Sequence, residues 1–290
     1  MTGAPVEGTL GVRDGKVVVV KEGREGREVT AKSLGAAVDP LLTRTGQAAR
    51  TAAVATKVTQ PQVSSANLAA LGIEEQMSTF TVNFPTAPYR TTNIGRAAEL
   101  INGSLVQPGE VWSFNETVGE RTEENGFVDG TMILDGRYQE APGGGVSAVA
   151  TTVFNAVFFA GVQPSSTAPT PSTSSATRPA ARRPSPGQPG PEVPQRLGQA
   201  DLHRRERTDS SVTITFYGTK KYDSVEAVAG PRTNVTEPEK REATGKTCVP
   251  QEPLEGFDIA VDRVFKNGGE EVKRQTFKTH YTPRDEVVCN

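Results

Sequence analysis

A proline-rich stretch from residue 164 to residue 207 sets the strongest limit on how this chain can fold. It holds nine of the 21 prolines in a sequence of 290 residues, and it contains no Phe, Trp or Tyr. Proline lacks a backbone donor, and a segment with so few large apolar side chains cannot bury enough surface to offset the entropy lost on ordering. We therefore expect an irregular tract here, with packed parts before and after it.

Charge and hydropathy exclude several classes of protein. The 32 Lys and Arg residues against 34 Asp and Glu leave a net charge of −2, so we expect no nucleic-acid partner. The sequence lacks an apolar run of 18 or more residues, so we expect no transmembrane helix. Residues 1–8 also lack the basic and apolar regions of a secretory signal, a pattern that by itself indicates a cytoplasmic protein.

Cysteine and histidine are too scattered to predict a metal centre. Cys248 and Cys289 could form one disulfide or stay as two free thiols, and their spacing does not decide between these. The only histidines are His203 and His280. Metal sites need ligands gathered in clusters, and no glycine-rich phosphate loop with its Lys is present, so we expect no metal and no cofactor.

The first part of the chain carries hairpin and helix signals. Apolar runs at 9–12 and 17–20 flank Asp14-Gly15, a turn in which Gly accepts a positive φ, so we expect a β-hairpin. A helix is expected over 31–42. These elements are typical of the end of a larger α+β module, and we expect its beginning to be missing.

A second core precedes the proline-rich tract. The alternation at 79–84 predicts a strand, and Thr92-Asn93 is expected to cap an amphipathic helix. We expect the only Trp, Trp112, in a strand at 111–114.

Three consecutive glycines then lead into a strongly apolar helix that ends before Gly161. Gly143-Gly144-Gly145 permits a sharp turn or a close backbone approach, and Ser147 falls near the N-cap, where its hydroxyl can accept a free N–H. After the tract, strand alternation at 212–217 and later apolar runs predict a β-rich C-terminal third.

Several short motifs around the glycine loop resemble one family. They are Asn93-Ile94, Asn102-Gly103, Pro108-Gly109-Glu110, Ser113-Phe114-Asn115, Gly119, Gly126-Phe127, Gly143-Gly144-Gly145-Val146-Ser147 and Thr151-Thr152-Val153-Phe154-Asn155-Ala156. In order and spacing they resemble the VanW-like family of bacterial cell-envelope proteins. The C-terminal region is similar to the segment that follows in longer actinobacterial members, and the N-terminal region resembles the end of the peptidoglycan-binding-like module that commonly precedes it.

We therefore predict an α+β fold in four parts. They are a remnant of a peptidoglycan-binding-like module at 1–60, a central VanW-like α+β domain at 78–163, the irregular tract at 164–207, and a C-terminal β module at 208–290.

The resemblance also implies a location and a partner. VanW-like proteins are accessory envelope proteins, named from vancomycin-resistance clusters, without an established reaction. We expect this protein to be extracytoplasmic, to bind peptidoglycan or its stem peptide, and to contact the membrane only through an anchor missing from this chain. That location favours a Cys248–Cys289 disulfide over free thiols.

An enzymatic role depends on Ser147. Most relatives have Cys-Gln or Ser-Gln after the glycines, whereas this chain has Ser147-Ala148. A nucleophile at a helix N-terminus needs a base, and the His-x-x-His-Ser segment of relatives corresponds here to the proline-rich tract. We therefore assign no catalytic residue, and Ser147 is the single candidate for one. We predict that the ligand is bound by Gly143, Gly144, Gly145, Ser147 and Trp112. The alternatives are a Ser/Cys-type hydrolase or transferase of cell-wall peptide, and an inactive relic.

The tract itself has two explanations. Codons for a family-like peptide, read one nucleotide out of frame, yield residues 166–178, and a shift back relates residues 192–197 to a family-like strand and turn. Our hypothesis is therefore a compensated pair of frameshifts over 164–207. A natural inserted linker is the alternative. Resequencing the locus distinguishes the two, because an intact frame in related strains would contradict a frameshift.

Overall fold

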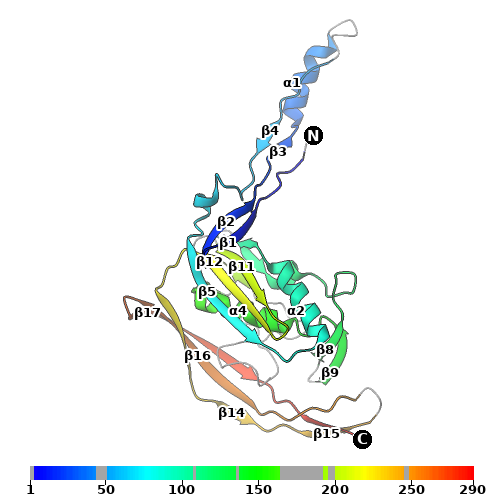
Figure 1. The fold of residues 1–290 in the computed structure, drawn as a ribbon, viewed down its shortest axis with the longest axis vertical. Coiled ribbons are helices and arrows are strands. Elements are labelled where there is room, and N and C mark those ends of the chain that lie inside the picture. The colour runs from blue at the N-terminus through cyan, green and yellow to red at the C-terminus, as the bar shows by residue number, and fades with distance from the viewer. Residues whose placement is uncertain are drawn as a thin grey trace. The chain divides into compact units, whose positions relative to one another are not determined.

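The computed structural model divides the chain into two compact units, Met1–Leu71 and Gly72–Asn290 (Figure 1). It describes residues 3–43, 51–106, 109–134, 137–163, 192–194, 200–244 and 248–290. Most of the predicted irregular tract, residues 164–191 and 195–199, therefore lies outside the described residues, and the frameshift hypothesis stays a prediction.

The first unit is built from short local elements. It contains β1 (Thr9–Arg13), β2 (Lys16–Lys21), β3 (Gly26–Glu28), α1 (Ala31–Leu42), β4 (Lys57–Thr59) and the 3-10 helix η2 (Leu68–Leu71). Strands β1 and β2 form the expected antiparallel hairpin, and its turn residues Asp14 and Gly15 both have positive φ, 52° and 75°. Helix α1 has the predicted bounds, and its start is stabilised by a reciprocal capping box of the Thr30 and Ser33 side chains.

The centre of the second unit is a four-stranded antiparallel sheet in the order β5-β12-β11-β6. Its strands are β5 (Glu75–Asn83), β6 (Ser104–Val106), β11 (Ala200–Arg207) and β12 (Ser211–Gly218). Strand β11 and the short β10 (Glu192–Pro194), which pairs with β7 (Val111–Ser113), lie within the tract. Their sequences have no strand pattern, so these strands depend on pairing with neighbours far away in the sequence.

Two helices of 14 residues pack with this sheet, α2 (Pro88–Ile101) and α4 (Ser147–Ala160). The prediction that Thr92-Asn93 caps α2 is wrong: the helix begins one turn earlier, at Pro88, with extended Ala87 as its N-cap. Proline suits the first helical position because its missing N–H would have no partner there and its φ is already helical. Asn93 is thereby placed inside the helix.

Short elements connect these helices. Strand β7 carries Trp112 as expected, but the predicted strand ends one residue early, because Phe114 begins α3 (Phe114–Val118). The Ser113 hydroxyl accepts the Glu116 N–H at 3.3 Å and so caps α3. Strands β8 (Asp129–Leu134) and β9 (Arg137–Pro142) form an antiparallel hairpin that leads into the glycine loop.

The C-terminal part is a second antiparallel sheet around one long strand, which confirms the β-rich expectation. Strand β16 (Gly256–Asn267) pairs with β17 (Glu270–Tyr281) on one side and with β13 (Ser224–Ala229) and β14 (Thr233–Thr236) on the other. A separate parallel pair is formed by β15 (Lys240–Ala243) and β18 (Glu286–Cys289).

Helix α4 is the common core of the second unit. Every residue of α4 except Ser147 and Phe159 is buried. One face joins the cluster formed with α2 and the central sheet, while Phe154 and Phe158 pack with apolar residues of β16 in a second cluster. The α+β class predicted from the sequence is thus confirmed, and both sheets depend on one helix.

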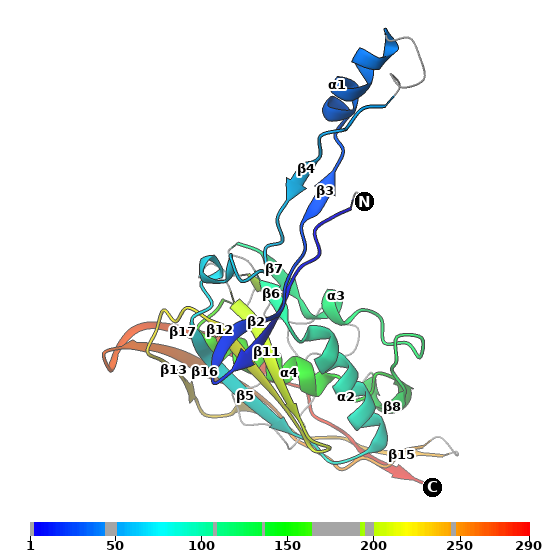
Figure 2. The ribbon, with the colours of Figure 1, turned by 45° about the horizontal axis from the view of Figure 1, so that its top comes forward.

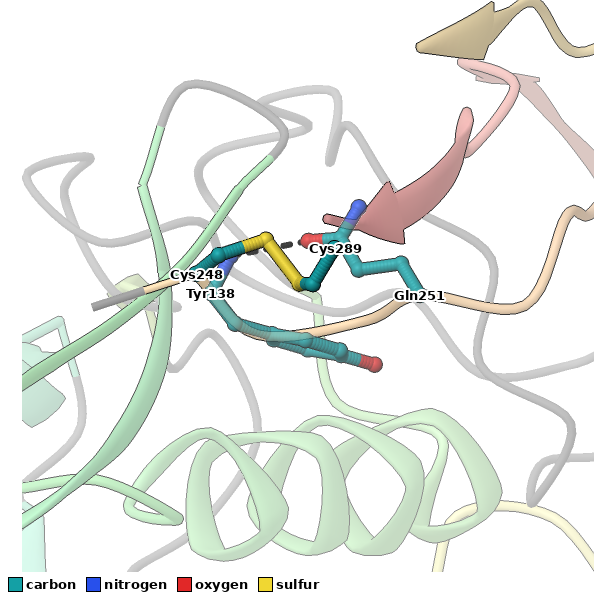
Figure 3. The surroundings of a disulfide bond; sticks show 4 residues. All are labelled: Tyr138, Cys248, Gln251 and Cys289. Atoms are coloured by element: carbon teal, nitrogen blue, oxygen red, sulfur yellow. Dashed lines mark hydrogen bonds between the residues drawn. A yellow bond between two sulfur atoms is a disulfide. The ribbon is translucent and has the colours of Figure 1, made fainter. Parts of the chain in front are cut away.

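The predicted disulfide is present. Cys248 and Cys289 are bonded, with their Cα atoms 5.8 Å apart (Figure 3). Close to it, Gln251 Oε1 accepts the backbone N–H of Tyr138 at 2.9 Å, so the C-terminal segment is attached to β9.

Candidate functional site

A fully buried asparagine holds the glycine loop in place. Asn93 of α2 donates from Nδ2 to the Val128 and Gly144 carbonyls at 2.8 and 3.0 Å, and its Oδ1 accepts the Val128 N–H at 2.8 Å. One side chain therefore ties together α2, the segment before β8 and the loop before α4. These elements lie side by side in Figures 1 and 2.

The three glycines are needed because the loop is crowded. A Cβ on Gly143 would lie 2.7 Å from Arg121 Cβ, one on Gly144 would overlap the backbone of Gly130, and one on Gly145 would lie 3.2 Å from Arg90 Cγ. Gly143 and Gly145 also have φ of 89° and 92°, which side chains disfavour. The loop thus brings the starts of α2, β8 and α4 together, and we call this meeting point the glycine junction.

Ser147 is the first residue of α4 and is half-buried. The expectation that its hydroxyl caps the helix is wrong: Val146 is the N-cap, and no side-chain cap bond is present. The carbonyls of Gly143 and Gly145 accept the N–H groups of Val146 and Ala148 at 3.1 and 2.9 Å, so the loop backbone does the capping.

Ser147 has no hydrogen-bonded base among the described residues. No hydrogen bond among them joins its Oγ to a histidine, a lysine or a carboxylate. His280 instead bonds through Nδ1 to Asp258 Oδ1 at 2.5 Å, across the pairing of β16 and β17. The His203 side chain lies outside the described residues.

Two arginines flank the loop, and the sequence pattern did not single them out. Arg90 stands beside Gly145; its Nη1 donates to the Pro85 carbonyl at 3.1 Å, and its guanidinium lies 5.2 Å from the Tyr89 ring centre. Arg121 stands beside Gly143 and donates to Gly119 O at 2.9 Å and to Asn115 Oδ1 at 2.6 Å. Burial lowers the pKa of the Arg121 guanidinium.

A profile of the family described as "VanW like protein" matches residues 89–226. The chain carries a VanW-like domain. This confirms the resemblance, and the match extends through the proline-rich tract, which contains β11, to include β12.

One relative supports the same assignment. Uncharacterized protein YoaR of Bacillus subtilis (strain 168) is 36% identical over 103 residues, a stretch that covers 36% of this chain and 34% of YoaR. The match thus spans about a third of that relative's length. No solved structure matches the chain significantly.

The VanW-like domain contains the whole glycine junction, from Tyr89 and Arg90 to Ser147. Of the predicted ligand-binding residues, the three glycines and Ser147 lie together there. Trp112 is 8% exposed and packs edge-on against Phe114 with ring centres 6.4 Å apart, within the hydrophobic core. It leaves little surface for a ligand.

Arg90 and Arg121 were missed because nothing in their local sequence distinguishes them from solvated arginines. Asn93 was noted only as a motif residue and a cap. A polar residue among the apolar positions Ile94, Ala97 and Ala98 was the available signal of a buried hydrogen-bonding role.

Two further features concern the described residues as a set. None of the helices among them is long and apolar enough to cross a membrane. The same residues contain no group of three or more His, Cys, Asp or Glu side chains placed to hold a metal ion.

Proposed function

We propose that this protein is an accessory protein of the bacterial cell envelope that binds peptidoglycan or its stem peptide through the glycine junction. One observation carries the proposal: the VanW-like domain gathers its glycine loop, two half-buried arginines and the start of α4 at one place, and among the described residues no base is hydrogen-bonded to Ser147. Polar donors around a crowded backbone loop suit recognition of a peptide.

An extracytoplasmic location is part of this proposal. Disulfides persist in oxidising compartments, and the Cys248–Cys289 bond supports such a location. The VanW-like domain also supports an extracytoplasmic location, because the family that it resembles consists of envelope proteins.

The test is co-sedimentation of the purified chain with insoluble peptidoglycan. We expect the chain to sediment with peptidoglycan, and Ser147→Ala to sediment equally, because binding does not need a nucleophile. Soluble fragments should not accumulate. If the chain stays in the supernatant at every concentration, the proposal fails. If wild type releases fragments and Ser147→Ala does not, a hydrolase acting through Ser147 replaces it.

A further inference from the structure

The two arginines at the glycine junction differ from three other arginines of the second unit. Arg96, Arg241 and Arg274 each form an ion pair with a carboxylate. Arg90 and Arg121 form none with any described residue, although both are half-buried.

Their hydrogen-bonding capacity is also largely unused. A guanidinium has five N–H donors. Among the described residues, Arg90 donates one hydrogen bond, to a backbone carbonyl, and Arg121 donates two, to a carbonyl and an amide oxygen. All these acceptors are neutral, so no described residue balances either positive charge.

An unbalanced cation that is partly removed from water is unfavourable, and an anionic ligand would relieve this. The stems of the two arginines contact Gly145 and Gly143, which are separated by a single residue. The positive end of the α4 dipole begins two residues after Gly145 and adds to the same positive potential.

We infer that Arg90 and Arg121 bind a carboxylate of the cell-wall peptide, with the planar guanidinium fork matching the two carboxylate oxygens. This inference rests on the proposed function and names the chemical group that the site recognises. It makes the two arginines ligand-binding residues and leaves Ser147 outside the recognition step.

The experiment measures binding of the full chain to an N-terminally labelled synthetic stem pentapeptide, in two forms. One form has free carboxylates, and in the other every carboxylate is converted to a carboxamide. We expect the free acid to bind at least about tenfold more tightly, and Arg90→Gln and Arg121→Gln each to lose about tenfold for the free acid alone. The matched control is Arg96→Gln on the same helix as Arg90, since Arg96 is already paired with Glu99.

Thermal unfolding checks that each variant is folded. Where a Gln variant is unfolded, Arg→Lys at that position keeps the charge but loses the fork, and we expect a smaller loss of the same sign.

Each other outcome has one meaning. If the chain binds both peptide forms equally, or if the two Gln variants bind the free acid as well as Arg96→Gln does, the inference is overturned and the proposed function stands. If neither form nor insoluble peptidoglycan binds, the proposed function fails. If poly(glycerol phosphate) binds in an arginine-dependent way and the free-acid peptide does not, the arginines serve a phosphate polymer and the inference is overturned.

Discussion

At the scale of single residues, helix α4 carries two adjacent threonines in the core that differ in their hydrogen bonding. Thr152 Oγ1 donates to the Ala148 carbonyl at 2.7 Å. Its neighbour Thr151 is 1% exposed, and its Oγ1 has no hydrogen-bond partner among the described residues. An unpaired buried hydroxyl costs free energy, whereas a paired one contributes a small net gain.

These two threonines form a matched pair for substitution by the isosteric Val. We expect Thr151→Val to leave the free energy of unfolding unchanged or raise it by about 1 kcal/mol, and Thr152→Val to lower it by about 1 kcal/mol. Urea denaturation of both variants measures the difference. A loss at Thr151 as large as that at Thr152 would show that the Thr151 hydroxyl has a partner in solution.

At the scale of elements, the β8 strand and the glycine loop approach so closely that a methyl group has no space. Gly144→Ala places its Cβ against the Gly130 backbone, which is held by strand pairing and cannot move aside. We expect a loss of about 2–3 kcal/mol in unfolding free energy. The control is Gly269→Ala in the β16–β17 turn, where φ is 82° but no atom lies within 4 Å of the added Cβ. It should cost about 1 kcal/mol, from backbone strain alone.

The outer face of β16 and β17 gives this pair of strands a dependence on pH. Hydrogen bonds from Asn234 and His280 lower the pKa of Asp258, and those from Thr276 and Arg274 lower the pKa of Asp262. Below an ordinary aspartate pKa of 3.8, the unfolded chain therefore binds more protons than the folded one. The stabilisation that these two carboxylates contribute is complete above that pH, and it is lost as the pH falls through their lowered pKa values in the folded state.

Thermal unfolding between pH 6 and pH 2.5 measures this loss. The wild-type melting temperature should fall steeply below pH 4, and less steeply in Asp258→Asn and Asp262→Asn, which lack the titrating groups. Parallel curves for all three proteins would contradict the assignment of the pH dependence to these carboxylates.

At the scale of the whole second unit, a buried arginine joins the C-terminal sheet to α4. Arg263 of β16 is fully buried and donates to the carbonyls of Val162 and Val157 at 2.9 and 3.0 Å, where α4 ends. Its guanidinium also lies over the Phe158 and Phe265 rings, at 5.0 and 4.7 Å from their centres. Burial disfavours the charged form of Arg263 and so lowers its pKa. The two carbonyls and the two rings offset part of this cost by stabilising the guanidinium charge.

Removing this side chain should loosen the attachment of the sheet. We expect Arg263→Ala to cost about 3–5 kcal/mol, because it leaves a cavity and two carbonyls without their donor. Arg274→Ala on the exposed face of the same sheet should change stability little, because exposed ion pairs contribute little. Denaturant unfolding of both variants tests the contrast, and equal effects would refute the attachment role.

The disulfide acts at the same scale, because it closes a loop with a sequence separation of 41 residues. Loop-closure entropy predicts that Cys289→Ser lowers the unfolding free energy by about 3–4 kcal/mol. Reduced wild type should unfold like Cys289→Ser, and that variant should not respond to reductant. Rapid labelling of both thiols without prior reduction would show that the bond is not formed.

Local sequence determined the elements whose physical causes are local. Asp14-Gly15 specified a hairpin by backbone conformation, the apolar spacing after Gly145 specified α4, and Thr30 with Ser33 fixed the start of α1. The three consecutive glycines also predicted a loop where the backbone turns sharply or lies close to another group.

Tertiary structure decided what depends on groups distant in the sequence. Asn93 became a buried link because the chain brings Val128 and Gly144 to it, and β11 became a strand because β12 and β6 lie on either side of it. Arg90 and Arg121 are singled out only by their positions beside Gly145 and Gly143 and by the lack of an ion pair with any described residue. Such roles depend on contacts between distant segments, which local propensity and spacing do not encode.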